Sequence, residues 1–265
     1  NYITKIVKNE AGEYEVKVEH DDATVVLYEI EEDGSIGKAC DVYCAYGTGP
    51  LGQQTLSHLH SVYFAPFGDF CLICDKGGDL IHTLRIDRKA KKLIACDEPF
   101  HTQSGTMPRY AAFHPEKPFV YTNNEAEPFL YAFRYNPDGK LELIGQVPGM
   151  SEEIPYSGAP YSVKQSDIRM SEDGKYLYSL VRDAGVISVY LINEETGMPE
   201  MIQCRKIEDK DPHCCAISPD GRFLLVGGLH THKVYSYTIN ENGTLGDCAA
   251  SCDQPSACSI VFYTL

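Results

Sequence analysis

A repeated pattern is the feature that most constrains how this chain can fold. Four copies begin 49, 57 and 47 residues apart along the sequence. They read HSVYFAP over 60–66, RYAAFHP over 109–115, a looser SDIRMSEDG over 166–174, and HCCAISP over 213–219. Two further apolar runs follow in each copy, and a polar turn such as the NPDG of 136–139 ends it. A period of roughly 40 to 50 residues with several short strands per copy is typical of a β-propeller.

The copies divide the chain into blades. Residues 57–247 hold four complete copies, and residues 1–50 look like the outer half of another, with a hairpin-like insertion over 5–20. The tail from Pro255 aligns with the start of the preceding copy and is expected to supply only an innermost strand. We therefore expect an all-β fold, a single β-propeller domain over residues 1–265. Its blades are four-stranded and antiparallel, and about five of them are represented.

The composition argues against several classes of partner. The formal charge is 23 − 38 = −15, and so acidic a surface disfavours nucleic acid and anionic membranes as partners. No apolar run approaches the roughly 20 residues of a membrane span. Eleven cysteines, an odd number, are better interpreted as free thiols than as a disulfide framework. A reducing, cytoplasmic compartment is therefore expected. Strand alternation predicts that Cys71 and Cys74 point to opposite faces of one strand.

Aligning the copies identifies two columns of ionisable side chains. In a propeller the innermost strand of each blade lines the central channel, and residues at its start and at the end of the next strand surround the channel mouth. The column at the start of the innermost strand holds His60, Arg109, Ser166 and His213. The column at the end of the next strand holds Lys76, Glu125, Arg182 and Leu229. Convergent charged groups near a channel favour a functional site that binds an anion.

Other motifs point to no cofactor and no metal. The GTGPLG string over 47–52 matches a dinucleotide-binding pattern, but no βαβ unit surrounds it. The pairs His58/His60 and His230/His232 have the spacing of metal ligands on a strand, yet neither has a third ligand at a clear spacing.

The order of the motifs along the whole chain resembles the lactonase family of seven-bladed β-propellers. That family includes bacterial 6-phosphogluconolactonase and the fungal 3-carboxy-cis,cis-muconate lactonizing enzyme. The resemblance rests on residues 58–62, 106–109, 113–115, 124–125, 167–174, 178, 182–183, 212–213 and 218–223. It implies a seven-bladed ring, so the chain would lack about two N-terminal blades; closure as a five-bladed ring is the alternative.

The resemblance also implies roles for individual residues. The family's proposed catalytic histidine falls on His60, its acidic partner on Glu125, and its two arginines on Arg109 and Arg182. Either Glu125 or His60 is expected to activate water, while the arginines hold the substrate's anionic group and the carbonyl oxygen. Three further residues are expected to bind substrate, with the first two assisting a phosphate: Lys76, His213 and His58.

The expected function is hydrolysis of a small anionic sugar lactone, most simply 6-phosphogluconolactone to 6-phosphogluconate in the pentose phosphate pathway. The same residues could serve a muconate-type lactonizing cycloisomerase, because both reactions need an anion clamp and an acid/base pair. A non-catalytic propeller that binds a partner, or a small-anion binder without turnover, are further alternatives. The sequence predicts no oligomeric state.

Overall fold

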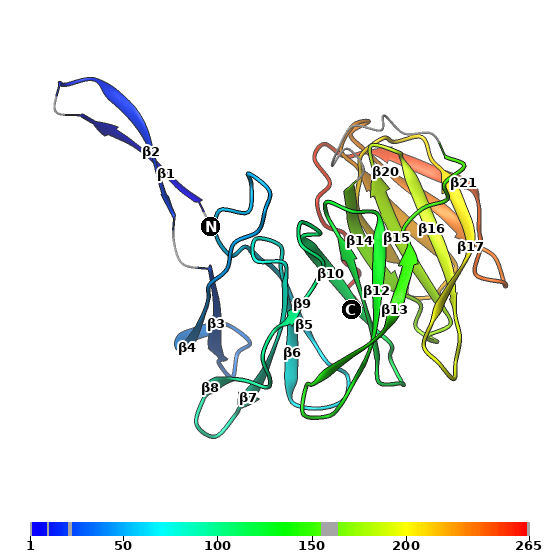
Figure 1. The fold of residues 1–265 in the computed structure, drawn as a ribbon. Helices are drawn as coiled ribbons and strands as arrows, with labels where there is room; N and C mark the ends of the chain where they lie inside the picture. The colour runs from blue at the N-terminus through cyan, green and yellow to red at the C-terminus, as the bar shows by residue number, and fades with distance from the viewer. Residues whose placement is uncertain (1, 10, 21–22, 155–163, 264–265) are drawn as a thin grey trace.

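The chain is built from antiparallel β-strands (Figure 1). The computed structural model describes residues 2–9, 11–20, 23–154 and 164–263. Throughout these ranges the regular structure is strand, and no helix is long and apolar enough to cross a membrane.

Three sheets have four strands in simple sequential order, as expected for propeller blades. The first contains β10 (Pro108–Phe113), β11 (Phe119–Asn124), β12 (Phe129–Tyr135) and β13 (Leu141–Pro148). The second contains β14 (Lys164–Met170), β15 (Tyr176–Arg182), β16 (Val186–Ile192) and β17 (Pro199–Lys206). The third contains β18 (Pro212–Ile217), β19 (Phe223–Gly228), β20 (Lys233–Ile239) and β21 (Leu245–Asp253).

The N-terminal third of the chain forms one further blade and part of another. The blade contains β5 (Leu59–Phe64), β6 (Phe70–Asp75), β7 (Leu80–Asp87) and an outer strand split into β8 (Lys92–Ala95) and β9 (Phe100–His101). The partial blade is the two-stranded sheet of β3 (Ala23–Ile30) and β4 (Ile36–Ala45). A separate hairpin, β1 (Tyr2–Lys8) with β2 (Tyr14–His20), corresponds to the expected insertion.

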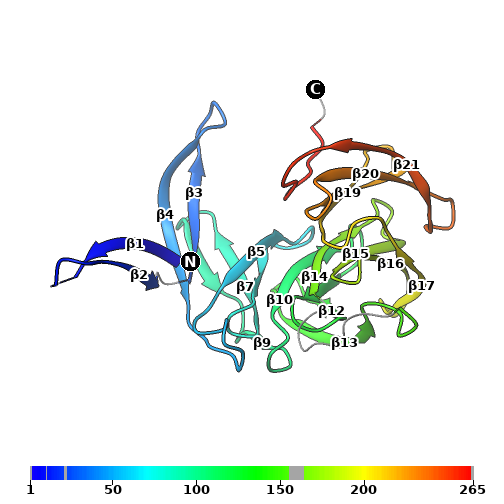
Figure 2. The same ribbon diagram turned by 90° about the horizontal axis from the view of Figure 1, so that it is seen from above.

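The blades stand side by side along an open arc (Figure 2). The arc runs from β3–β4 at one end to β18–β21 at the other, and the β1–β2 hairpin projects away from it. The first strand of each complete blade lies toward the inside of the arc. This arrangement confirms the expected propeller architecture of four complete blades and an outer half-blade.

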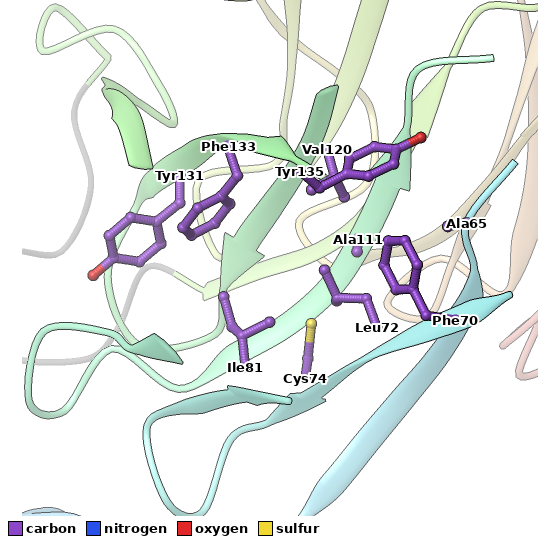
Figure 3. Packing of buried hydrophobic residues seen from close by; sticks show 10 residues of the cluster. All are labelled: Ala65, Phe70, Leu72, Cys74, Ile81, Ala111, Val120, Tyr131, Phe133 and Tyr135. Carbon is purple, nitrogen blue, oxygen red and sulfur yellow. The ribbon is translucent and has the colours of Figure 1, made fainter. Parts of the chain in front are cut away.

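Apolar clusters between neighbouring blades hold the arc together. Figure 3 shows the cluster between the β5–β9 and β10–β13 blades, in which Phe70 and Leu72 face Phe133 and Tyr135. Equivalent clusters lie at the next two blade junctions. Burying large side chains on both faces of each sheet fixes the angle between blades, and thereby the position of the strand ends that carry the site.

Two expectations about local structure have different outcomes. Cys71 and Cys74 belong to different core clusters on opposite sides of β6, which confirms the predicted alternation. The expected innermost strand of the tail does not form, because residues 254–263 have turn or irregular backbone. The tail lies beside β18, where the Ala257 carbonyl accepts a hydrogen bond from the Cys214 thiol at 3.3 Å. One such contact does not make the ladder of backbone partners that a strand requires.

Candidate active site

A β-bulge at the start of each innermost strand positions the first column of site residues. In β5, Leu59 pairs with Asp75 and Ser61 with Cys74, so His60 is the extra residue. In β18 the extra residue is His213, between Pro212 and Cys214. The pairing of β10 and of β14 shifts in the same way around Arg109 and Ser166. A bulge changes the direction of its side chain, and bulges are common beside active sites. The repeated irregularity therefore turns this whole column toward the same face of the arc.

Hydrogen bonds between the bulges connect four blades. The Ser61 hydroxyl donates to the Arg109 carbonyl at 2.7 Å, and the Arg109 Nη1 donates to the Ser166 carbonyl. The Ser166 hydroxyl donates to the Pro212 carbonyl at 2.6 Å. Because each bond joins one blade to the next, the column is held as a single unit.

Glu125 lies at the centre of the site, immediately after β11. Its Oε2 accepts hydrogen bonds from Lys76 Nζ at 3.0 Å and Arg109 Nε at 3.2 Å, and Arg182 Nη2 lies 3.7 Å from its Oε1. Burial alone would raise the pKa of this carboxyl group. The cations Lys76, Arg109 and Arg182 more than offset burial and lower the pKa to about 2. Glu125 is thus a carboxylate at neutral pH, shared by three positive side chains from three blades.

His60 is a partly buried imidazole at the edge of this cluster. Its ring packs edge-on against Tyr110, with 5.0 Å between ring centroids, and the Arg109 guanidinium lies 4.7 Å from the same tyrosine ring. Burial, followed by the charges of Arg109 and Lys76, lowers the pKa of His60 to about 4. The imidazole is therefore neutral at physiological pH and can accept a proton.

Arg182 and His213 form the other side of the site. Arg182 ends β15, and its Nε lies 4.0 Å from Asp211 Oδ1. Burial and then the charge of Arg109 lower the pKa of Arg182. Burial and the two arginines likewise lower the pKa of His213. Burial, and after it the charge of Arg109, therefore lowers the pKa of both histidines of the first column.

The loop after β6 carries Lys76 and is fixed by the buried carboxylate of Asp75. Asp75 Oδ1 accepts hydrogen bonds from the backbone N–H groups of His58 at 2.7 Å, Gly77 at 3.0 Å and Gly78 at 3.1 Å. The Lys76 N–H donates in turn to the His58 carbonyl at 3.0 Å. His58 is thus joined to the Lys76 loop through its backbone.

Replacing Gly77 by alanine should disturb this loop. A Cβ at Gly77 would lie 1.9 Å from the Leu56 carbonyl oxygen and 2.6 Å from the His58 nitrogen, both of them backbone atoms that cannot rotate away. We expect a loss of about 1–3 kcal/mol in the free energy of unfolding, measured by denaturant titration. Gly52→Ala is the control, because its Cβ would meet no atom within 4 Å. Equal stability of the two variants would contradict the close approach.

The structure brings together all seven residues that the sequence singled out. Contacts or charge interactions link His60, Arg109, Glu125, Arg182, Lys76, His213 and His58, and the His58 backbone also supports the Lys76 loop. Their chemical roles remain predictions. Sequence reasoning missed Asp211, which occupies the same column as His58, two residues before the bulge. It also missed Tyr110, which stands inside the 109–115 copy of the repeat, and Asp75, which directly follows the apolar run of 70–74.

No three His, Cys, Asp or Glu side chains gather to hold a metal ion in the parts of the chain that the structure describes.

Comparison with known proteins identifies the family. The sequence matches the family described as "Lactonase, 7-bladed beta-propeller" over residues 3–262. The chain belongs to this lactonase family. The lactonase propeller of a putative 6-phosphogluconolactonase from Bacteroides fragilis superposes with a TM-score of 0.78, at 27% sequence identity over 89% of this chain and 66% of that one. A periplasmic gluconolactonase from Pseudomonas aeruginosa, 21% identical, has the same fold with a TM-score of 0.79.

Two curated relatives carry the name 6-phosphogluconolactonase. The protein from Formosa agariphila is 26% identical over 85% of this chain. The protein from Bacillus subtilis is 24% identical over 78% of it. The chain spans 64% and 57% of the lengths of these two relatives.

Proposed function

We propose that this lactonase-family protein hydrolyses a small anionic sugar lactone, with 6-phosphogluconolactone as the first candidate. The observation that carries the proposal is the convergence of a neutral imidazole, His60, with three cations around the carboxylate of Glu125. Distant similarity to proteins named 6-phosphogluconolactonase supports the choice of substrate. The cluster has three positive side chains, Lys76, Arg109 and Arg182, and two negative ones, Glu125 and Asp211. This local excess of positive charge favours an anionic ligand despite the net charge of −15.

Water addition to the lactone would follow from the charge states of these groups. His60 removes a proton from water, and the resulting hydroxide attacks the lactone carbonyl carbon. The carbonyl oxygen becomes an oxyanion beside the positive side chains. The bond between the carbonyl carbon and the ring oxygen then breaks, and the proton on His60 passes to the ring oxygen to form a hydroxyl group. The product carboxylic acid releases one proton to solvent.

The charge states also separate the roles of His60 and Glu125. A carboxylate with a pKa of about 2 is a poor proton acceptor, whereas an imidazole with a pKa of about 4 is a better one. Protonated His60 is in addition a strong enough acid to assist the leaving oxygen. We therefore assign proton transfer to His60, and to Glu125 the positioning of Lys76, Arg109 and Arg182.

Acid release from 6-phosphogluconolactone tests this function. The protein should produce acid well above the spontaneous rate, and Arg182→Ala should lower kcat/KM by about 100-fold or more. Lys206→Ala is the control, since it removes an exposed positive charge from β17, the outermost strand of the same blade. The absence of turnover in folded protein would overturn the phosphosugar assignment.

We further propose a cytoplasmic location and a single propeller domain that is part of a seven-bladed ring. All eleven cysteines are free thiols, which supports a reducing compartment. The half-blade β3–β4 exposes Ile30 and Ile36 by 69% and 73%. Side chains of this kind are normally covered by a neighbouring strand or blade, which supports a larger ring.

A further inference from the structure

The two arginines of the site differ in their hydrogen bonding. Arg109 is 4% exposed, and it donates from Nε to Glu125 and from Nη1 to the Ser166 carbonyl. Arg182 has its Nε and Nη2 buried and without a hydrogen-bond partner among the residues that the structure describes. These two nitrogens form one edge of the guanidinium group, the edge that binds two acceptor atoms side by side. Arg182, rather than Arg109, is therefore available to a ligand.

Two other residues of the site, Asp211 and His213, also have polar atoms that are unpaired among the described residues. Asp211 Oδ1 is 4.0 Å from Arg182 Nε, too far for a hydrogen bond, and no described side chain or backbone group pairs with it. His213 Nδ1 is also buried and, within the described ranges, unpaired. A donor and an acceptor thus lie 4.0 Å apart, and the His213 ring interacts electrostatically with both residues. Buried polar atoms are normally paired, so unpaired atoms of both kinds indicate a ligand that donates as well as accepts.

A hydroxyl group can pair with both Arg182 and Asp211, whereas a carboxylate or a fully ionised phosphate cannot. A hydroxyl accepts a hydrogen bond from Arg182 and donates its own proton to Asp211. A carboxylate oxygen can only accept, and it would lie beside the negative charge of Asp211. We propose that Arg182, Asp211 and His213 bind a hydroxyl-bearing carbon of the substrate, and that this subsite selects polyhydroxylated sugar lactones over polycarboxylate lactones.

The anionic group of the substrate then belongs at the opposite side of Glu125. Lys76 Nζ can donate three hydrogen bonds and makes one to Glu125, and its side chain is 22% exposed. Three backbone N–H groups occupy Asp75 Oδ1, and Asp75 Oδ2 lies 3.6 Å from His82 Nε2. Lys76 therefore has free donors, while Arg182 faces a carboxylate. This inference rests on the proposed function in one respect, namely that the cluster around Glu125 binds the substrate.

Two probe ligands test the subsite by isothermal titration calorimetry. The first is 6-phosphogluconate, which carries hydroxyl groups, and the second is tricarballylate, a polycarboxylate without them. Asp211→Asn should weaken the binding of 6-phosphogluconate by about tenfold, because it removes a charge-assisted acceptor. The same change should leave tricarballylate binding unchanged or strengthen it, because it removes a repulsive charge.

Asp247→Asn is the matched control. This carboxylate is fully exposed on the same blade, 3.2 Å from Arg205, and its loss should change neither Kd. The Asp211 backbone N–H bonds to Asp209, an interaction that the variant keeps, and thermal unfolding checks that it folds. A change of the two Kd values in the same direction by the same factor would overturn the subsite.

The outcomes also separate this inference from the proposed function. Wild-type protein that binds 6-phosphogluconate through Asp211 but hydrolyses no lactone would support the subsite and overturn the proposed hydrolysis. Hydrolysis of the lactone, accompanied by equal changes in both Kd values in Asp211→Asn, would support the proposed function and overturn the subsite. Failure of wild-type protein to bind either probe would overturn both.

Discussion

Replacing Glu125 by glutamine should lower kcat/KM for the lactone by about 100-fold or more and reduce the free energy of unfolding by about 3–5 kcal/mol. The glutamine keeps the shape of the side chain but removes the only charge that Lys76, Arg109 and Arg182 share. Three cations would then remain close together in a site where the Glu125 side chain is only 13% exposed. Breaking a buried ion pair on one side is costly because the remaining charge is left uncompensated.

Glu127→Gln is the control for this substitution. It makes the same chemical change two residues along the chain, on an exposed side chain. Steady-state hydrolysis and urea titration of the two variants provide the comparison. If Glu125→Gln were as stable as Glu127→Gln, Glu125 would not be the group that compensates the three cations.

The free energy of unfolding of the Glu125→Gln variant should also fall less than that of the wild type as the pH is lowered. The pKa of Glu125 falls from its usual 4.5 to about 2 in the folded protein, which corresponds to about 3 kcal/mol. A depressed pKa contributes stability that is fully present above pH 4.5 and is lost as the pH falls toward 2. The difference in stability between wild type and variant should therefore narrow across this range. A difference that stays constant from pH 5 to pH 2.5 would contradict the pKa of Glu125.

The position of the site could be predicted from sequence because the repeat reduces it to an alignment problem. His60, Arg109 and His213 share one column and Lys76, Glu125 and Arg182 share another, so a regular blade geometry brings both columns to one face of the arc. The reason for their orientation could not be predicted. The β-bulges that turn the first column depend on pairing between strands, and a bulge has no side-chain periodicity of its own.

Residues whose role depends on one particular partner could not be predicted from the sequence either. Asp211 stands in a column whose other members are His58, Met107 and Lys164, so the alignment shows no shared chemistry there. Its importance arises only from the 4.0 Å separation from Arg182. The tail likewise shows that alignment predicts which strand a segment resembles, whereas pairing partners decide whether a strand forms.

The acid limb of the pH–rate profile should have an apparent pKa near 4. His60 must be neutral to accept a proton from water, so activity should be constant above this pH and decline below it. An ordinary histidine would give a limb near 6.5, but burial, then Arg109 and then Lys76 lower the pKa of His60 to about 4. Hydrolysis measured between pH 3.5 and pH 7.5 tests this, with spontaneous hydrolysis subtracted at each pH. A limb near 6.5 would contradict the environment assigned to His60.

Two variants assign that limb to His60. His60→Gln should lower kcat/KM by about 10²–10⁴-fold, whereas His101→Gln, a change at an exposed histidine on β9, should leave it unchanged. Lys76→Met removes a positive charge that lowers the pKa of His60, so the limb of the remaining activity should move from about 4 toward 6.5. Glu125, with a pKa of about 2, would give a limb at much lower pH. A limb that stays near 4 in Lys76→Met would contradict the assignment of that limb to a group whose pKa the charge of Lys76 lowers.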